Sequence, residues 1–257
     1  MDTTEWPICH RDHLFGFNPR PVIFLSYRCF LTIHHVRAGR TPSMAHTWFF
    51  LASFSSSICL YALYSILEPH FDDPKQKSWI VTFVASSVTS TSSLPFLRDF
   101  ALSRGDMLAI QRRTPFSEVI VGVFNGFLIA DLVIGFLCYR QQLSPIFGWV
   151  HHISYLFISA HVVIQGWTHA FCVCLVMEMP TWLLAVSSLW PMLRNDVLFA
   201  TIFLLTRIVL HAILLVKTAR LKAGNTMFGD SRSPIWLLSA AFVAHLLWFS
   251  SFVRRSS

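Results

Sequence analysis

Seven long apolar runs, separated by short polar links, are the feature that most constrains this chain. They lie at approximately residues 46–67, 78–97, 116–139, 149–165, 170–190, 196–216 and 234–253. A helix needs about 20 mostly apolar residues to cross the hydrocarbon core of a bilayer. Of the 257 residues, 54% are hydrophobic. Only 13% are charged, against roughly 25% in an ordinary soluble domain. We therefore expect an all-α integral membrane protein with about seven transmembrane helices, and the composition excludes a soluble enzyme.

The polar links and the two ends of the chain divide it into four parts. Residues 1–45 are mixed and basic, and Arg28 interrupts their apolar patch, so we expect an interfacial or disordered segment. Residues 46–76 hold the first predicted helix and its loop. Residues 77–253 hold the other six helices, and residues 254–257 form a basic tail.

The formal net charge of +7 reflects membrane topology, as the location of the basic residues indicates. Apart from Arg207, every Lys and Arg lies in a link, in a terminus or in the last residues before one. If the helices cross the membrane alternately, 13 of them lie on one side and six on the other. The positive-inside rule then predicts a cytosolic N-terminus and a C-terminus on the opposite side. We expect membrane lipids as partners and no nucleic acid, and the sequence does not define an oligomeric state.

Ionisable residues inside the predicted helices are the strongest indication of function. Each costs about 2.5–3.5 kcal/mol near the centre of a membrane helix on insertion scales. Four of them are predicted at similar depth near the midplane, from a rise of about 1.5 Å per residue. These four are Asp131, His161, Glu178 and Arg207, and the other four are His151, His152, His211 and His245.

The fourth predicted helix, residues 149–165, has a polar half and an apolar half. With about 100° between successive residues, its polar side chains fall on one stripe. The stripe consists of His151, Ser154, His161 and Gln165, and the opposite half consists of Ile153, Leu156, Phe157, Ala160, Val163 and Ile164. We interpret this division as one face toward lipid and one face toward a polar interior.

For each polar feature of the spans, two interpretations stay open from the sequence alone. Arg207 forms an interhelical ion pair with Glu178 or Asp131, or it contacts a ligand directly. Pro180 marks a cavity near Glu178 or only a kink in the helix. The histidines are structural members of the bundle or members of a site, and His211 and His245 favour the structural role.

Several known chemistries are excluded by missing motifs. The chain has no HExxH, no HxxHH, no GxSxG and no Walker A loop. It therefore lacks the ligand sets and nucleophile settings of zinc proteases, di-iron hydroxylases, serine hydrolases and nucleotide-binding P-loops. A haem bound between His161 and His211 stays conceivable. We expect neither a metal site nor a cofactor.

Several short features follow one another in order between residues 77 and 253. They are Trp79 before a Ser/Thr-rich helix, Asp131-Leu132, His151-His152, Glu178-Met-Pro-Thr, Asn195, Phe203 and Arg207-Ile208. In this order they resemble the TLC-domain family, which includes the ceramide synthases. The resemblance implies a six-helix membrane barrel around a lipid-accessible cavity, here preceded by one extra transmembrane helix.

The same resemblance bears on the histidine pair. In ceramide synthases the paired histidines serve as base when a sphingoid amine attacks an acyl-CoA thioester, which would give a catalytic role to His151 and His152. The synthase motif also carries an acidic pair after the histidines, and this chain has no carboxylate between His152 and Glu178. The resemblance is therefore to the non-synthase members, which are associated with lipid homeostasis and endoplasmic reticulum trafficking.

We accordingly expect a TLC-type protein of the endoplasmic reticulum that binds a lipid or acyl chain in an intramembrane cavity and takes part in lipid homeostasis and membrane lipid composition. The predicted lipid-binding residues are His161, Glu178, Arg207, Asp131, Ser154 and Gln165. One alternative is an acyl-CoA-dependent lipid N-acyltransferase with His151 and His152 as catalytic residues. Another is a noncatalytic trafficking receptor of the endoplasmic reticulum, with Arg254-Arg255-Ser-Ser as a retrieval signal if it faces the cytosol.

Overall fold

The computed structural model describes residues 46–110, 114–221, 228 and 231–256, and all of the regular secondary structure described is helical. The described residues belong to one compact unit, the second of two in the chain, which covers Met44–Ser257. The segment that we expect to be interfacial or disordered, residues 1–45, lies outside the described residues.

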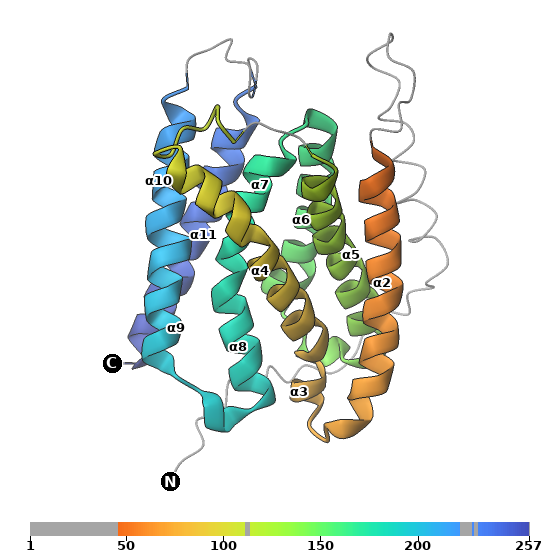
Figure 1. The fold of residues 1–257 in the computed structure, drawn as a ribbon. Helices are drawn as coiled ribbons and strands as arrows, with labels where there is room; N and C mark the ends of the chain where they lie inside the picture. The colour runs from red at the N-terminus through yellow and green to blue at the C-terminus, as the bar shows by residue number, and fades with distance from the viewer. Residues whose placement is uncertain (1–45, 111–113, 222–227, 229–230, 257) are drawn as a thin grey trace. The chain divides into compact units, whose positions relative to one another are not determined.

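Within the described residues, six helical segments are long and apolar enough to cross a membrane. They are α2 (Thr47–Leu67), α3 (Pro74–Lys77) with α4 (Ile80–Leu102), α5 (Pro115–Cys138), α7 (Thr168–Cys174) with α8 (Met179–Leu189), α9 (Asp196–Phe203) with α10 (His211–Ala219), and α11 (Ser233–Ser256) (Figure 1). This confirms the all-α class and the expectation of several transmembrane helices. Helix α11 runs to Ser256, so residues 254–256 of the predicted basic tail are helical.

The remaining predicted segment, the fourth at residues 149–165, is helical but shorter. It forms α6 (His151–Gln165), which follows a six-residue π-helix, Pro145–Val150. It ends at Gly166, whose φ of +78° is the left-handed conformation that glycine adopts without a steric penalty. This tight turn lets α7 begin two residues later.

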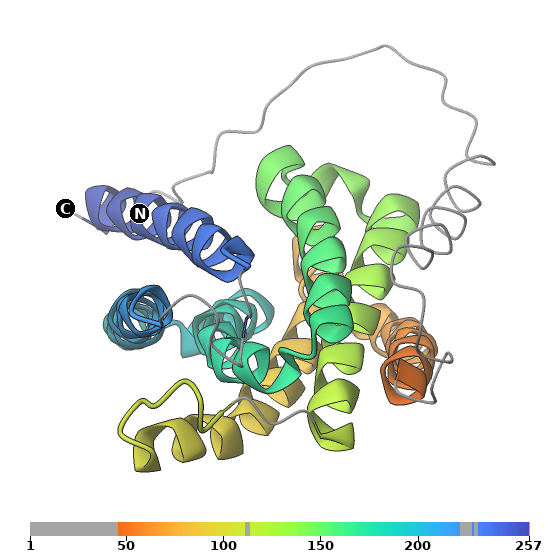
Figure 2. The same ribbon diagram turned by 90° about the horizontal axis from the view of Figure 1, so that it is seen from above.

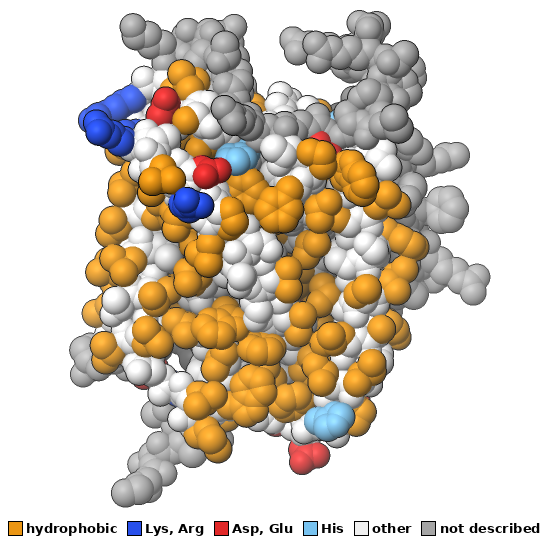
Figure 3. Space-filling view, viewed as in Figure 1, with side chains coloured by type: hydrophobic (Ala, Val, Ile, Leu, Met, Phe, Trp, Pro, Cys, Tyr) orange, Lys and Arg blue, Asp and Glu red, His pale blue; other side chains and the backbone are white. Residues whose placement is uncertain are grey.

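The helices run in alternating directions between two ends of the second unit. The C-terminal ends of α2, α5, α8 and α11 lie at one end, and those of α4, α6 and α10 lie at the other (Figure 1). Seen from above, α2 lies at one edge against α5, and α9, α10 and α11 lie at the opposite edge (Figure 2). On the face between the two ends, nearly all of the coloured side chains are hydrophobic, and the charged ones lie toward the ends (Figure 3).

Helix α5 is the most buried of the six spans. Two thirds of its most apolar stretch (67%) is buried inside the structure, compared with 6% for α11. It begins with a capping box, in which the Thr114 hydroxyl accepts from the Ser117 amide and the Ser117 hydroxyl accepts from the Thr114 amide. This central helix carries Asp131 into the interior.

Close packing of α2 on α5 depends on two glycines four residues apart. A side chain at Gly122 would meet the Phe49 carbonyl oxygen at 2.6 Å, and one at Gly126 would overlap Ser56 and the Ser53 backbone. The Ser57 hydroxyl also donates to the Gly126 carbonyl at 2.9 Å. Small residues at this spacing let membrane helices approach closely, so these glycines fix the position of α2.

Replacing Gly126 by Ala should therefore separate α2 from α5. Overpacking of a tight contact costs about 1–3 kcal/mol, and we expect a loss of this size in the free energy of unfolding in mixed micelles. Val133→Leu is the control, since Val133 is 47% exposed on the same helix. Equal stability of the two variants would contradict this account of the packing.

Candidate functional site

Several ionisable residues of the spans form two groups, and His151 connects them. We define the Asp131 group as Asp131, Tyr139 and His152. The Arg207 group consists of Arg207, the Met177 carbonyl, Glu178, Thr181, Phe203 and Trp248. The groups bring together side chains from α5, α6, the segment from Leu175 to Thr181, the middle of the α9–α10 span, and α11.

In the Asp131 group, a buried carboxylate lies between a phenol and an imidazole. Asp131 is 1% exposed, and the Tyr139 hydroxyl donates to its Oδ1 at 2.8 Å. The Nδ1 atom of His152 lies 3.0 Å from Oδ2, although the ring is not oriented for a hydrogen bond there. Asp131 is thus partnered by one residue from the end of its own helix and one from the start of α6.

The Arg207 guanidinium is held by two hydrogen bonds, which it donates to two different residues. Its Nε donates to the Met177 carbonyl at 2.8 Å, and its Nη2 donates to the Thr181 hydroxyl at 2.6 Å. The Glu178 Oε1 lies 3.7 Å from Nη2, which makes an ion pair without a hydrogen bond. Arg207 itself is buried, with 6% exposure. Among the two partners considered from the sequence, Arg207 therefore pairs with Glu178.

Irregular backbone in both helices creates the contact between Arg207 and the Met177 carbonyl. Leu175–Glu178 is a 3-10 segment, and Pro180, which has no N–H to donate to the preceding turn, follows it. The Met177 carbonyl in this interrupted stretch accepts from Arg207. Arg207 in turn lies within a π-helical segment, Leu204–Leu210, a feature that often marks functional sites in helices.

Two aromatic rings flank the guanidinium. The carbon at its centre lies 5.4 Å from the ring centre of Phe203 and 5.3 Å from that of Trp248. Both distances are within the range of cation–π attraction. The rings remove Arg207 from water on the sides that the polar partners leave uncovered.

Two histidines join α11 to the helix that carries Arg207. The His211 Nε2 lies 3.0 Å from the Leu238 carbonyl, which only accepts, so Nε2 carries the proton. The Nδ1 atoms of His211 and His245 lie 3.0 Å apart, and His245 Nδ1 is also 3.2 Å from the Arg207 carbonyl. Neutral His245 with its proton on Nδ1 satisfies both contacts. The histidine pair thus links α11 to the span that carries Arg207.

His151 connects the two groups through its ring. The ring centre lies 5.7 Å from that of His152, 4.6 Å from that of Tyr155 and 6.0 Å from that of Trp248. Since Trp248 lies over Arg207, these contacts form a continuous polar and aromatic path from Asp131 to Arg207. His151 and Trp248 are only partly buried, so the path approaches the surface between α6 and α11.

The remaining predicted residues lie apart from this path. His161 packs edge-on against Trp167 and lies 3.4 Å from the Ser233 hydroxyl. Ser154 and Gln165 are exposed. The expected meeting of four ionisable residues at one depth is therefore replaced by separate contacts, with Asp131 beside His152, Arg207 beside Glu178, and His161 beside Ser233.

Helix α6 is also rotated relative to the expected division into two halves. Its buried residues are Ser159, Ala160, Val162 and Val163, and two of these, Ala160 and Val163, were assigned to the lipid-facing half. The Asn125 side chain of α5 donates to Ser159 at 2.7 Å. This buried hydrogen bond, together with apolar packing beside it, turns Ser154 and Gln165 outward.

Three contributing residues were missed by the sequence reasoning. Tyr139 directly follows α5, and its non-helical backbone turns its hydroxyl back to Asp131. Thr181 follows Glu178 by three residues, so its hydroxyl was within reach of the same partner. No sequence feature indicates the contact of Trp248 with Arg207, because only the packing of α11 brings the two together.

Comparison with known proteins supplies no relative: no family model, no curated protein and no solved structure matches the chain. Among the described residues, no group of three or more His, Cys, Asp and Glu side chains is placed to hold a metal ion. The chemistry of the two groups is therefore the basis for a functional proposal.

The hydrogen bond from Arg207 to Thr181 gives a direct test of the Arg207 group. Thr181→Val keeps the shape of the side chain and removes the acceptor. Hydrogen bonds to charged groups contribute roughly 1.5–3 kcal/mol, and we expect a loss of this size in the free energy of unfolding in mixed micelles. Thr181→Ser keeps the hydroxyl and should lose much less. If both variants unfold like the wild type, the guanidinium is not held as described.

Proposed function

We propose that this chain is a TLC-type membrane protein of the endoplasmic reticulum that binds a lipid or acyl chain at the Arg207 group and takes part in lipid homeostasis. The supporting observation is the buried Arg207 with an aromatic residue on each side. A charge of this kind inside a membrane helix is expensive, and such residues mark functional sites.

The chemistry of arginine favours an oxygen-rich ligand. A guanidinium presents five N–H donors in a rigid fork, and the bonds to Met177 and Thr181 use two of them. Phosphate and carboxylate oxygens match the geometry of this fork. The apolar part of a lipid would lie along the rings of Phe203 and Trp248. A lipid headgroup or a fatty-acyl carboxylate is thus the class of ligand that fits.

The proposed family and fold agree with the order of the features from Trp79 to Arg207. In this proposal α4 to α11 form the six-helix barrel, and α2 is the extra helix. The edge position of α2 and its packing on α5 support that assignment (Figure 2). Ser154 and Gln165 are not part of the proposed site, because both are exposed.

Lipids that copurify with the full-length protein test this proposal. We expect Arg207→Lys to lower the bound lipid per protein about tenfold, because losing one charge-assisted hydrogen bond costs roughly 1.5–3 kcal/mol. Lysine keeps the charge but cannot reproduce the fork. The exposed Arg194→Lys is the matched control, and both variants are compared by quantitative mass spectrometry. Unchanged lipid in Arg207→Lys would show that the guanidinium is structural.

A second candidate is lipid N-acyl transfer, which one contact favours specifically. The chain lacks an acidic pair after the histidines, yet Asp131 from the preceding helix lies 3.0 Å from His152. A carboxylate beside an imidazole can orient it and stabilise its protonated form during general-base catalysis. His152 would take the proton as the amine nitrogen bonds to the thioester carbon, and the proton would pass to the departing thiolate.

Acyl transfer from acyl-CoA to a long-chain amine tests the second candidate. In this mechanism His151→Ala with His152→Ala abolishes turnover. Asp131→Asn lowers kcat by about 10²–10⁴-fold, the range of general-base contributions, with little change in KM. Turnover that persists in the double variant would exclude these histidines. Bound lipid without any turnover in the wild type would exclude catalysis and leave the first proposal.

A further inference from the structure

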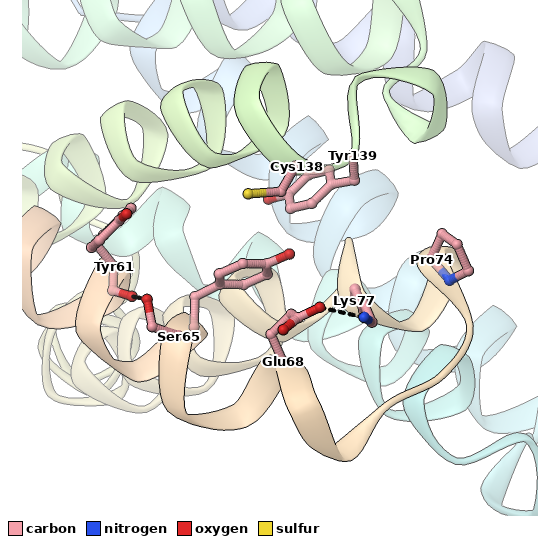
Figure 4. A pocket seen from close by; sticks show the side chains of 8 residues that line it. Tyr61, Ser65, Glu68, Pro74, Lys77, Cys138 and Tyr139 are labelled. Carbon is pink, nitrogen blue, oxygen red and sulfur yellow. Dashed lines mark hydrogen bonds and ion pairs between the residues drawn. The ribbon is translucent and has the colours of Figure 1, made fainter.

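A pocket lies at the end of the second unit where α2, α3 and α5 meet. We call it the α2–α3 pocket. It has a volume of about 450 Å³ and is lined by Tyr61, Tyr64, Ser65, Glu68, Pro74, Lys77, Cys138 and Tyr139 (Figure 4). This volume is within the roughly 300–1,000 Å³ of small-molecule sites.

Local sequence signals build this pocket. The Asp73 side chain caps α3 by accepting from the Lys75 amide at 2.8 Å, and Pro74 occupies the first helical position, where no N–H is needed. This places Lys77 at the end of α3, where its ammonium forms an ion pair with Glu68. Figure 4 shows both charged groups at the mouth between α2 and α3.

The position of the pocket corresponds to the level of lipid headgroups. Its lining comes from the last turns of Thr47–His70 and Pro115–Cys138 and from the first turn of Pro74–Leu102, all candidate membrane spans. The ends of spans lie at the boundary between hydrocarbon and water, where tyrosines are enriched. A lipid lying beside α2 would present its headgroup at this height.

The charges of the pocket favour a ligand that carries both signs. One carboxylate and one ammonium leave no net charge, and their side chains are only partly exposed, 35% for Glu68 and 25% for Lys77. A purely anionic or cationic ligand would satisfy one charge and leave the other without a partner, which is costly in a partly buried site. A zwitterion replaces the ion pair by two new ones.

The aromatic lining narrows the choice of cation. The rings of Tyr64 and Tyr139 lie 5.9 Å apart at 54°, and Tyr61 is 52% exposed beside them. Tyrosine faces attract quaternary ammonium groups, which cannot donate hydrogen bonds. We propose that the α2–α3 pocket binds the phosphocholine headgroup of a membrane lipid, with the phosphate at Lys77 and the trimethylammonium between Glu68 and the tyrosines.

This inference does not rest on the proposed function. Tyr61, Glu68 and Lys77 belong to neither the Asp131 group nor the Arg207 group. Substitutions at these three positions therefore leave the Arg207 group intact, and loss of lipid in Arg207 variants does not bear on the preference for choline.

The test uses the full-length protein in mild detergent with equal amounts of phosphatidylcholine and phosphatidylglycerol. Native mass spectrometry measures the ratio of the two lipids that stay bound. We expect the wild type to prefer phosphatidylcholine by about fivefold, and Tyr61→Leu to remove most of this preference, in line with the roughly 0.5–1 kcal/mol of an exposed cation–π contact. Tyr61→Phe keeps the ring and should keep the preference.

An exchange of the two charges separates binding from stability. Glu68→Lys with Lys77→Glu retains an ion pair but reverses its direction, and a lipid tethered by its acyl chains cannot turn around, so the preference should fall. The matched control exchanges Arg194 and Asp196, an exposed ion pair outside the pocket. A preference unchanged in both the charge exchange and Tyr61→Leu would overturn the proposal.

Soluble phosphocholine distinguishes a lipid from a free ligand. At millimolar concentration it should displace phosphatidylcholine from the wild type, because the headgroup is the recognised part. Bound phosphatidylcholine that resists displacement would mean that the acyl chains are recognised, which contradicts the proposal. Retention of phosphocholine without any retention of phosphatidylcholine would show that the site binds a free molecule and that the assignment to a lipid is wrong.

Discussion

The Arg207 guanidinium is the charge around which the polar interior of this protein is organised. Removing an ion from water costs several kcal/mol, and only good geometry and additional hydrogen bonds offset that cost. Here the Met177 carbonyl and the Thr181 hydroxyl accept from two of its nitrogens, Glu178 lies at 3.7 Å, and Trp248 covers one face. The partners come from two successive turns around Met177–Thr181 and from α11, so the charge holds three spans in register.

The position of α11 also depends on contacts with Arg207 and its neighbours. Its side chains bury little apolar surface, so hydrophobic packing contributes less here than at α5. Contacts from Trp248 to the guanidinium and from His245 to the Arg207 carbonyl and to His211 attach it to the neighbouring span. A polar anchor of this kind is specific in direction, and His151 and Trp248 beside it stay partly exposed.

The sequence predicted what depends on apolar length and on the cost of burying charge. The helical class and the approximate span limits follow from those two principles, and Glu178 is one of the two partners that they suggest for Arg207. The rotation of α6 could not be predicted, because a stripe of polar residues does not specify which neighbour buries it; the single bond from Asn125 to Ser159 decides that. The glycine contact of α5 and the cover of Arg207 by Trp248 likewise depend on which helices become neighbours.

Photocrosslinking measures most directly whether a lipid reaches the polar interior. A fatty acid with a diazirine next to its carboxyl group would be irradiated with the full-length protein in a bilayer, and the labelled peptides identified by mass spectrometry. Our account predicts labels concentrated on α6 near His151, on the start of α8 and around Arg207 and Trp248. Labels spread evenly over outward-facing residues such as Phe54, Ile66 and Trp236, with none near Arg207, would contradict it.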